Sequence, residues 1–335
     1  MTLAEIARNA GLSIGTVDRV VHNRGKVSAL AREKIEAVIA AHGYTPNVAA
    51  RQLKRNAVLR VGVLLPEPGS GSGYWDKIIK GIYNAASTFK PFNIEIKSAF
   101  FNRERPGEML KAGEALLQNN VDGIILSPIV PDETQILAEK MQDIPYIYVD
   151  TPLSFTKPLV TIAQSPYRAG VCAGRMMKLL KGSGLFLTLR MFNHGYNLWE
   201  RVRGFTDYFA NDHNVAVLDG LYDNSISGSL YSYLDKLFLE HKHIDGIFVP
   251  HAEGHLTASY LVEEGKKNGT TLIGFDNLPL NRRALLDGAI DCLISQRADN
   301  QGFEALRTLY RKCVLCQTCD DVIEIPIDVY FRENI

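Results

Sequence analysis

Residues 10–28 read AGLSIGTVDRVVHNRGKVS, and they hold the end of one short helix and the whole of a second. Gly11 stands where the first helix needs a C-terminal cap, and Ser13 can cap the second helix. Three valines recur at the three and four spacing of a buried helical stripe: Val17, Val20 and Val21. The same spacing leaves six residues on the outer face: Ile14, Gly15, Thr16, Asp18, Arg19 and His22.

The helices on either side complete a three-helix unit. Thr2 and Glu5 form a capping box at the start of the first helix, while Ser28 begins the third helix and Gly43 closes it. The residues predicted to face inward are Leu3, Ile6, Ala7 and Ala10 in the first helix and Leu30, Ile35, Val38 and Ile39 in the third. All three helices would then share one small apolar core.

The charge of the chain is divided unevenly. Through residue 57 there are nine Lys and Arg residues against four Asp and Glu residues, a net charge of +5. The whole chain carries 37 of each kind, so the remaining residues carry a net charge of −5. A small positive module joined to a larger negative one is typical of a head that binds a polyanion.

The exposed Gly15 indicates which polyanion this is. A glycine inside a helix costs about 1 kcal/mol relative to alanine, so close approach of another molecule matters more here than helix strength. In a helix-turn-helix the second helix lies in the major groove of DNA, where small side chains let the backbone approach the bases. We therefore expect residues 1–46 to be a helix-turn-helix DNA-binding domain. A three-helix module that docks on proteins is the alternative.

The segment TLAEIARNAGLSIGTVDRVVHNRGKVS, followed by REKIEAVIAAHGYTPNVAARQL, resembles the DNA-binding head of the LacI/GalR family of bacterial transcription regulators. The resemblance implies that double-stranded operator DNA is the partner. The positions that would touch phosphates and bases are Ser13, Ile14, Gly15, Thr16 and Arg19, with His22 on the same outer face. Asp18 departs from the small hydroxyl residue usual in the family, so a family operator sequence cannot be transferred directly.

Residues 47–57 are predicted to be a hinge helix or linker. The run NVAARQLKRN can form a helix but is only about ten residues long, shorter than the ~12 to 15 residues that are stable alone in water. Two copies meeting on DNA could pack Ala49, Ala50 and Leu53 against each other. The family resemblance implies that Leu53 wedges into the minor groove and kinks the duplex. A plain charged linker is the alternative.

From residue 58 onward, short β runs alternate with amphipathic helical stretches. The candidate strands are 59–66, 93–101, 122–127, 145–150, 159–163, 184–190, 214–220, 245–250, 270–276, 291–296 and 322–331. Continuous apolar strands flanked by helices indicate parallel sheets buried on both faces. Because these strands are too many for a single sheet in a chain of this length, we predict an α/β body made of two doubly wound parallel-sheet subdomains.

The order of these elements resembles the type 1 periplasmic binding protein fold, which forms the sensor body of LacI/GalR regulators. The ligand-sensing domain would then span 58–335. Its N-subdomain would comprise about 58–160 and 297–321, and its C-subdomain about 161–296 and 322–335. Ligands in doubly wound sheets lie beyond the carboxyl ends of the strands, so the cleft between the subdomains is the expected pocket.

Strand ends and helix starts supply the predicted ligand-binding residues: Tyr74, Trp75, Asp150, Trp199, Arg201, His251, Asp276 and Gln296. Carboxylates and Arg can each bond two hydroxyls, and aromatic faces cover the apolar side of a sugar ring. We therefore predict a small-molecule effector that is a sugar or sugar derivative. His251 and Ala252 replace a common Asn-Asp pair of the family, and Ser165 replaces a frequent Asp, which indicates an unusual ligand.

Each of these residues also has a purely structural alternative. The two Trp residues could anchor the starts of helices, and the two Asp residues could cap the turns that follow them. Arg201 could pair with Glu200 or Asp207 on the surface.

Three other motifs fall short of the sites they suggest. Cys313, Cys316 and Cys319 in CVLCQTC lack a fourth nearby thiolate for an iron–sulfur cluster, so we expect packing thiols. HAEGH at 251–255 is not the HExxH of zinc enzymes, and GSGSGYW lacks the third glycine of a dinucleotide loop. We therefore predict no cofactor, no metal and no enzymatic activity.

Composition completes the expected picture. Nothing in the chain approaches the ~18 consecutive apolar residues of a membrane span, and its first residues lack the features of a signal peptide. We expect a cytoplasmic homodimer that reads a palindromic operator, with repression relieved by the ligand and no membrane partner. A cytoplasmic sugar-binding protein or sugar-acting enzyme built on the same α/β body is the alternative.

Overall fold

The computed structural model describes residues 3–21, 27–42, 58–69, 72–89, 93–141, 143–191, 195–223, 228–318 and 320–335. The chain divides into two compact units, Met1–Asn56 and Ala57–Ile335. The predicted hinge at 47–57 lies outside the described residues, as do the predicted caps Thr2 and Gly43.

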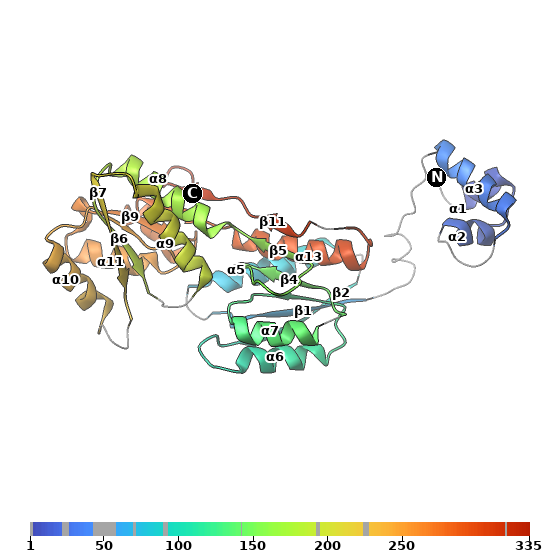
Figure 1. The fold of residues 1–335 in the computed structure, drawn as a ribbon, viewed down its shortest axis with the longest axis horizontal. Helices are drawn as coiled ribbons and strands as arrows, with labels where there is room; N and C mark the ends of the chain where they lie inside the picture. The colour runs from blue at the N-terminus through green and yellow to red at the C-terminus, as the bar shows by residue number, and fades with distance from the viewer. Residues whose placement is uncertain are drawn as a thin grey trace. The chain divides into compact units, whose positions relative to one another are not determined.

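The first unit is helical in its described part (Figure 1), with α1 Leu3–Ala10, α2 Ile14–Val21 and α3 Ala29–His42. Its core consists of Ile6, Ala7, Val17, Val20 and Ile35. Gly11 ends α1 with φ +67°, a conformation that favours glycine. The Thr16 N–H donates to Ser13 Oγ at 3.1 Å and the Ala31 N–H to Ser28 Oγ at 3.3 Å, so the two predicted serine caps are confirmed.

The prediction that Leu30 faces inward is wrong. Leu30 is 66% exposed, whereas Ile35 is fully buried. Five positions along a helix amount to a rotation of about 140° between the two side chains, so Leu30 cannot share the face of Ile35. Val38 and Ile39 do pack partly against the core, because they are three and four positions from Ile35.

The second unit contains two six-stranded sheets in its described part, in the orders β2-β1-β3-β4-β5-β11 and β7-β6-β8-β9-β10-β12. Neighbouring strands are parallel except for the antiparallel pair β10 and β12. The first sheet consists of β1 Leu59–Pro66, β2 Ile94–Phe101, β3 Gly123–Leu126, β4 Tyr146–Val149, β5 Val160–Ala163 and β11 Val322–Glu324. The second consists of β6 Gly184–Arg190, β7 Val215–Leu221, β8 Gly246–Phe248, β9 Thr271–Phe275, β10 Cys292–Ser295 and β12 Asp328–Tyr330. We call the first sheet with its helices lobe 1 and the second sheet with its helices lobe 2.

Helices cover both faces of each sheet (Figure 1). Lobe 1 has α5 Tyr74–Thr88, α6 Glu108–Leu117, α7 Pro131–Lys140 and α13 Ala298–Cys313. Lobe 2 has α8 Pro166–Leu180, α9 Tyr196–Phe209, α10 Leu230–His241, α11 Gly254–Glu263, α12 Pro279–Leu286 and the short 3-10 helix η2 Lys267–Gly269. Successive strand residues serve opposite faces: Val63 packs with the residues of α5 and α13, and Leu64 with those of α6 and α7. Both faces of these strands are therefore buried, as their continuous apolar sequences predict.

Glycines bring one pair of helices together in each lobe. A Cβ on Gly302 of α13 would lie 2.0 Å from the Ile78 carbonyl oxygen of α5. A Cβ on Gly204 of α9 would lie 2.1 Å from the Tyr167 carbonyl oxygen of α8. These helices pack backbone against backbone, which positions the starts of α5, α9 and α13 at the cleft between the lobes.

The run 322–331, predicted as one strand, is two strands in different sheets. Val322–Glu324 pairs with β5 in lobe 1, and Asp328–Tyr330 pairs with β10 in lobe 2. Pro326 lies between them, where a residue without an N–H donor interrupts the ladder.

Three segments join the lobes, after β5, after β10 and after β11. Gln164 in the first segment donates from Nε2 to the carbonyl oxygens of Ser295, where β10 ends, and of Pro326 in the third segment, at 3.0 Å each. Because β5 and β11 belong to the first sheet, the chain enters lobe 2 a few residues later than the predicted boundaries at 160/161 and 321/322.

Candidate functional site

In the first unit, the predicted outer face of α2 is on the surface. Ile14 is 55% exposed, and Gly15 and Arg19 are exposed beside it. Ser13 and Thr16 bond each other through their hydroxyls at 2.9 Å, which fixes the first turn of the helix. His22 lies outside the described residues, as does Leu53.

In the second unit, Asp150 and Asp276 occupy equivalent places in the two lobes. Each follows the fourth strand of its lobe in chain order, β4 for Asp150 and β9 for Asp276. Their φ angles are +72° and +67°, a conformation that costs a non-glycine residue free energy and is concentrated at functional sites. The main-chain N–H of each still bonds the next strand, at Ile162 and Ile294, so the carboxyl groups leave the sheet edges in a fixed direction.

Asp150 is surrounded by hydrogen-bond donors. The Tyr74 hydroxyl donates to its Oδ1 at 2.7 Å, and the Thr151 hydroxyl donates to its Oδ2 at 2.8 Å. Asn197 of α9, in lobe 2, donates to Oδ2 at 3.2 Å and to the Asp150 carbonyl oxygen at 3.1 Å. Burial, and then the nearby Asp150 and Asp276, raise the pKa of Tyr74 well above its usual value, so this phenol remains a donor.

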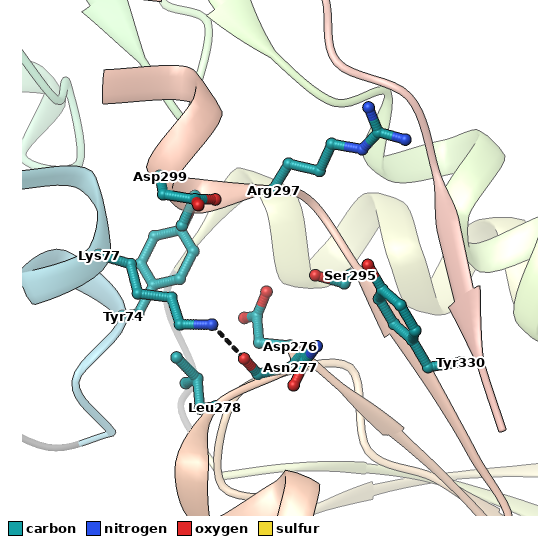
Figure 2. Close-up of a pocket in the computed structure, with 10 residues that line it drawn as sticks. Tyr74, Lys77, Asp276, Asn277, Leu278, Ser295, Arg297, Asp299 and Tyr330 are labelled. Atoms are coloured by element: carbon teal, nitrogen blue, oxygen red, sulfur yellow. Dashed lines mark hydrogen bonds between the residues drawn. The ribbon is translucent and has the colours of Figure 1, made fainter. Parts of the chain in front are cut away.

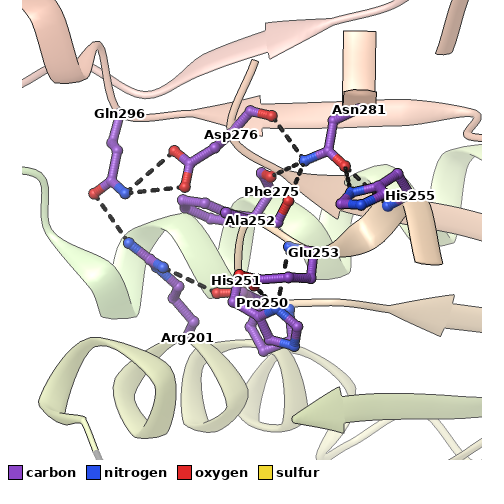
Figure 3. A network of polar contacts seen from close by, with 10 residues as sticks. All are labelled: Arg201, Pro250, His251, Ala252, Glu253, His255, Phe275, Asp276, Asn281 and Gln296. Atoms are coloured by element: carbon purple, nitrogen blue, oxygen red, sulfur yellow. Dashed lines mark hydrogen bonds and ion pairs between the residues drawn. The ribbon is translucent and has the colours of Figure 1, made fainter. Parts of the chain in front are cut away.

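Asp276 has fewer donors and a buried cation beside it (Figure 3). Gln296 donates to its carboxylate at 3.2 Å and accepts from Arg201 at 3.0 Å. The Arg201 guanidinium lies 3.7 Å from the centre of the Phe275 ring and donates to the Pro250 carbonyl oxygen. Burial raises the pKa of Asp276 to about 7, although Arg201 and Gln296 act in the opposite direction. Arg201 is only 5% exposed, so it is not a surface ion pair.

His251 and Asn281 support the loops around this cluster (Figure 3). Nδ1 of His251 lies 2.8 Å from Oε2 of Glu253. Burial raises the pKa of Glu253, but the hydrogen bond to His251, the nearby Arg103 and a backbone hydrogen bond together lower it overall. Asn281, fully buried in α12, donates to the main-chain oxygens of Ala252, Phe275 and Asp276. The position that departs from the family pattern is therefore a histidine held by a carboxylate.

A polar cavity of about 150 Å³ opens beside Tyr74 and Asp276 (Figure 2). Its other lining residues come from α5, the loop after β9, the end of β10 and the segment after it, the start of α13, and β12: Lys77, Asn277, Leu278, Ser295, Arg297, Ala298, Asp299 and Tyr330. Lys77 of lobe 1 donates to the Asn277 carbonyl oxygen of lobe 2. The cavity thus has walls from both lobes, as the predicted cleft requires.

The two tryptophans differ in their surroundings. Trp75 is partly buried against the lobe 1 core and packs edge to face on Tyr74, with ring centres 5.1 Å apart. Trp199 is 48% exposed and covers the guanidinium of Arg190 at 3.9 Å. Arg190 ends β6 and is bonded through two nitrogens to Asp219, and its third nitrogen is buried with no hydrogen-bond partner among the described residues.

Sequence reasoning missed four residues of this region: Arg190, Asn197, Gln164 and Gln301. Gln301 is fully buried within an apolar stripe of α13 that includes Ala298, Ala305 and Leu309. A polar residue inside such a stripe is a detectable signal, because buried polar groups need partners. Arg190 could also have been found, because it is a charged residue at the carboxyl end of a buried apolar strand.

Comparison with known proteins explains this arrangement. Residues 61–314 match the periplasmic binding protein domain, and residues 2–47 match the bacterial regulatory proteins of the lacI family. The chain belongs to the periplasmic binding protein domain family and carries a lacI-family regulatory domain at residues 2–47. It is therefore a DNA-binding transcription regulator, and the predicted family and fold class are confirmed.

Its similarity to named regulators extends over most of the chain. Catabolite control protein A of Priestia megaterium is 23% identical over 344 residues, covering 100% of this chain and 99% of that protein. The ribose operon repressor of Halalkalibacterium halodurans is 24% identical, over 83% of this chain and 81% of that protein. A solved LacI transcriptional regulator from Bacteroides fragilis has a TM-score of 0.78 at 25% identity, over 83% of this chain and 98% of that chain.

Within the described residues, no helix combines the length and apolar character needed to span a bilayer. The same residues contain no group of three or more His, Cys, Asp or Glu placed to hold a metal ion. Of the cysteine motif, Cys313 is half-buried and Cys316 is exposed, while Cys319 lies outside the described residues.

Proposed function

We propose that this regulator is a repressor whose affinity for its operator is controlled by a sugar or sugar derivative bound between lobe 1 and lobe 2. The observation that carries the proposal is the pair of strained, buried carboxylates Asp150 and Asp276, one from each lobe. Asp276 lines the polar cavity together with Tyr74, whose hydroxyl donates to Asp150. With Arg201 and Gln296 they present donors and acceptors from both lobes, which suits a ligand rich in hydroxyl groups.

Several aromatic and polar side chains would complete the effector site. Tyr74 and Trp75 offer aromatic surface in lobe 1, and Trp199 offers it in lobe 2, where apolar sugar faces can stack. His251, with its carboxylate partner, takes the place of the family's usual amide. The ribose operon repressor among the relatives supports a sugar as the effector.

The DNA-binding face would be the outer side of α2. Ser13, Ile14, Gly15, Thr16 and Arg19 would enter the major groove, with His22 near the backbone and Leu53 at the minor groove. A homodimer would place two such helices on the half-sites of a palindrome, with ~10 base pairs between half-site centres. The effector would act by changing the angle between the lobes, which alters the approach of the two hinges.

The test of this function is DNA binding as a function of salt. The full chain should shift a duplex taken from upstream of its own coding sequence, with affinity falling steeply as salt rises because phosphate contacts release counterions. Arg19→Ala should cost about 1 to 3 kcal/mol at one base position. Arg307→Ala removes an exposed, ion-paired Arg from α13 and should leave binding unchanged. Salt-independent binding, or no binding to any upstream fragment, would contradict the proposal.

A further inference from the structure

A single carboxamide connects the two halves of the candidate effector site. Gln301 of α13 is fully buried, and each of its polar atoms has a partner. Its Oε1 accepts from the Asp150 N–H at 2.9 Å. Its Nε2 donates to the Tyr74 hydroxyl oxygen at 3.3 Å and to the Gln296 carbonyl oxygen at 3.0 Å.

These bonds have a defined direction. The phenol of Tyr74 has one proton, which it donates to Asp150 Oδ1 at 2.7 Å, so its oxygen is available to accept from Gln301. Gln301 therefore holds Asp150 twice, through its main-chain N–H and, by way of Tyr74, through its carboxylate. The Asp150 N–H is shared with the Ile162 carbonyl oxygen at 3.0 Å, and it belongs to a residue with φ +72°.

The second hydrogen of the carboxamide reaches the residue that organises lobe 2. Gln296 follows β10, and its side chain bonds both Asp276 and Arg201. Hydrogen bonds thus run from Asp150 through Tyr74 and Gln301 to the main chain of Gln296, and the side chain of Gln296 in turn donates to Asp276. None of these bonds needs a water molecule or a surface side chain.

We propose that Gln301 is the positioning residue of the effector site. It fixes the carboxylate of lobe 1 and joins it to Gln296, so that a ligand ordering one half of the site also orders the other. This inference rests on the proposed sugar-binding function. Gln301 acts through Asp150, Tyr74 and Gln296, and the inference requires no contact between Gln301 and the ligand.

The decisive experiment is hydrogen exchange on the full chain without any sugar. Gln301→Met keeps the volume of the side chain and removes all three hydrogen bonds. Its matched control is Thr308→Val in the same helix, because Thr308 is as deeply buried and its hydroxyl oxygen has no hydrogen-bond partner in the part of the chain that the structure describes. We expect exchange at least about threefold faster in peptides covering 146–152 in Gln301→Met, because half of a shared amide bond is lost. We expect no change there in Thr308→Val.

Unchanged exchange at 146–152 in Gln301→Met would overturn the inference. Equal acceleration across the rest of α13 would also overturn it, since that pattern indicates a loosened helix and not a lost positioning contact. Neither result depends on ligand binding, so the proposed function would be unaffected by them.

Sugar affinity gives a second readout that a structural role would not change. The probe is whichever of D-ribose, D-arabinose, D-glucose and D-galactose raises the wild-type melting temperature most. Gln301→Met should weaken its binding about tenfold.

Gln301→Glu tests the direction of the bonds. Its carboxyl group accepts from the Asp150 N–H at any pH but donates only when it is protonated. The loss of sugar affinity in Gln301→Glu, relative to that in Gln301→Met, should therefore become smaller from pH 8 to pH 6. A constant ratio of the two affinities would contradict the directional bonds. Failure of all four sugars to bind wild type would count against the proposed function alone.

Discussion

Lobe 1 and lobe 2 have the same strand order and the same glycine-mediated helix pair, yet their equivalent aspartates lie in different surroundings. Asp150 accepts hydrogen bonds from Tyr74, Thr151 and Asn197. Asp276 accepts from Gln296 and lies among the buried Arg201 and other acidic groups. The repeated fold therefore sets where each carboxylate lies, and side chains from the helices decide how it is solvated. Two positions that match by topology can thus carry different chemistry.

The largest expected difference is in the pH dependence of stability. The pKa of Asp276 is about 7 in the folded chain and near 3.9 when unfolded. Between these values the folded chain keeps a proton that the unfolded chain has released, so stability falls as pH rises from 4 to 7. This loss is up to about 4 kcal/mol and does not increase above pH 7.

Asp276→Asn removes this titration, so it should lose less stability than wild type when urea unfolding is compared at pH 5 and pH 7.5. Asp150→Asn replaces one carboxylate oxygen by an NH2 group, so either the Tyr74 hydroxyl or the donors of Thr151 and Asn197 lose their acceptor. It should destabilise the protein by about 2 kcal/mol at both pH values. If the stabilities of the two variants depended on pH in the same way, the inferred difference in surroundings between Asp150 and Asp276 would be wrong.

A somewhat smaller effect tests what the lobes share. Gly302→Ala in lobe 1 and Gly204→Ala in lobe 2 each place a methyl group about 2 Å from a carbonyl oxygen. Each should cost about 3 kcal/mol of unfolding free energy, because the paired helices must separate. Gly254→Ala is the control, since its Cβ would meet nothing nearer than 3.4 Å. Stability equal to wild type in either of the first two variants would show that the close helix contact is not required.

A third comparison concerns one of the hydrogen bonds that cross between the lobes. Asn197 of lobe 2 donates to Asp150 and Thr151 of lobe 1, and the residues described around Asp276 include no equivalent amide from lobe 1. Asn197→Ala should weaken binding of the sugar selected above by about fivefold, measured by calorimetry. It should change the melting temperature little, because each lobe keeps its own core. An unchanged sugar affinity would contradict the prediction, because it would show that the contact of Asn197 with lobe 1 does not contribute to the effector site.

Most of the fold could be predicted from the sequence, because continuous apolar strands and helical spacing are local signals. Ten of the predicted strands coincide within one or two residues with those found. The split of 322–331 could not be predicted from periodicity, since both halves read as one apolar alternation. Pro326 is the local signal that the run is interrupted, but it does not show that the two halves join different sheets. The prediction that Leu30 is buried was wrong because it used the apolar character of the residue without its angular position around the helix.

The site was predicted less completely than the fold. Strand ends identified Asp150, His251, Asp276 and Gln296, because the carboxyl edge of a parallel sheet follows from sequence order. Asn197 and Gln301 come from helices, and their partners lie on distant segments, so no local pattern reveals what they bond. Whether the predicted residues contact a ligand stays a prediction.

The central claim is that a sugar held between the lobes changes DNA binding by the head. The measurement is fluorescence anisotropy of the upstream duplex with wild type and Asp276→Ala, with and without the sugar that gives the largest thermal shift. The account predicts that the sugar weakens DNA binding of wild type by about 5- to 150-fold, a coupling of ~1 to 3 kcal/mol. It predicts that Asp276→Ala binds DNA equally well without sugar and does not respond to it. A variant that responds like wild type, or a wild type that ignores every sugar it binds, would contradict the account.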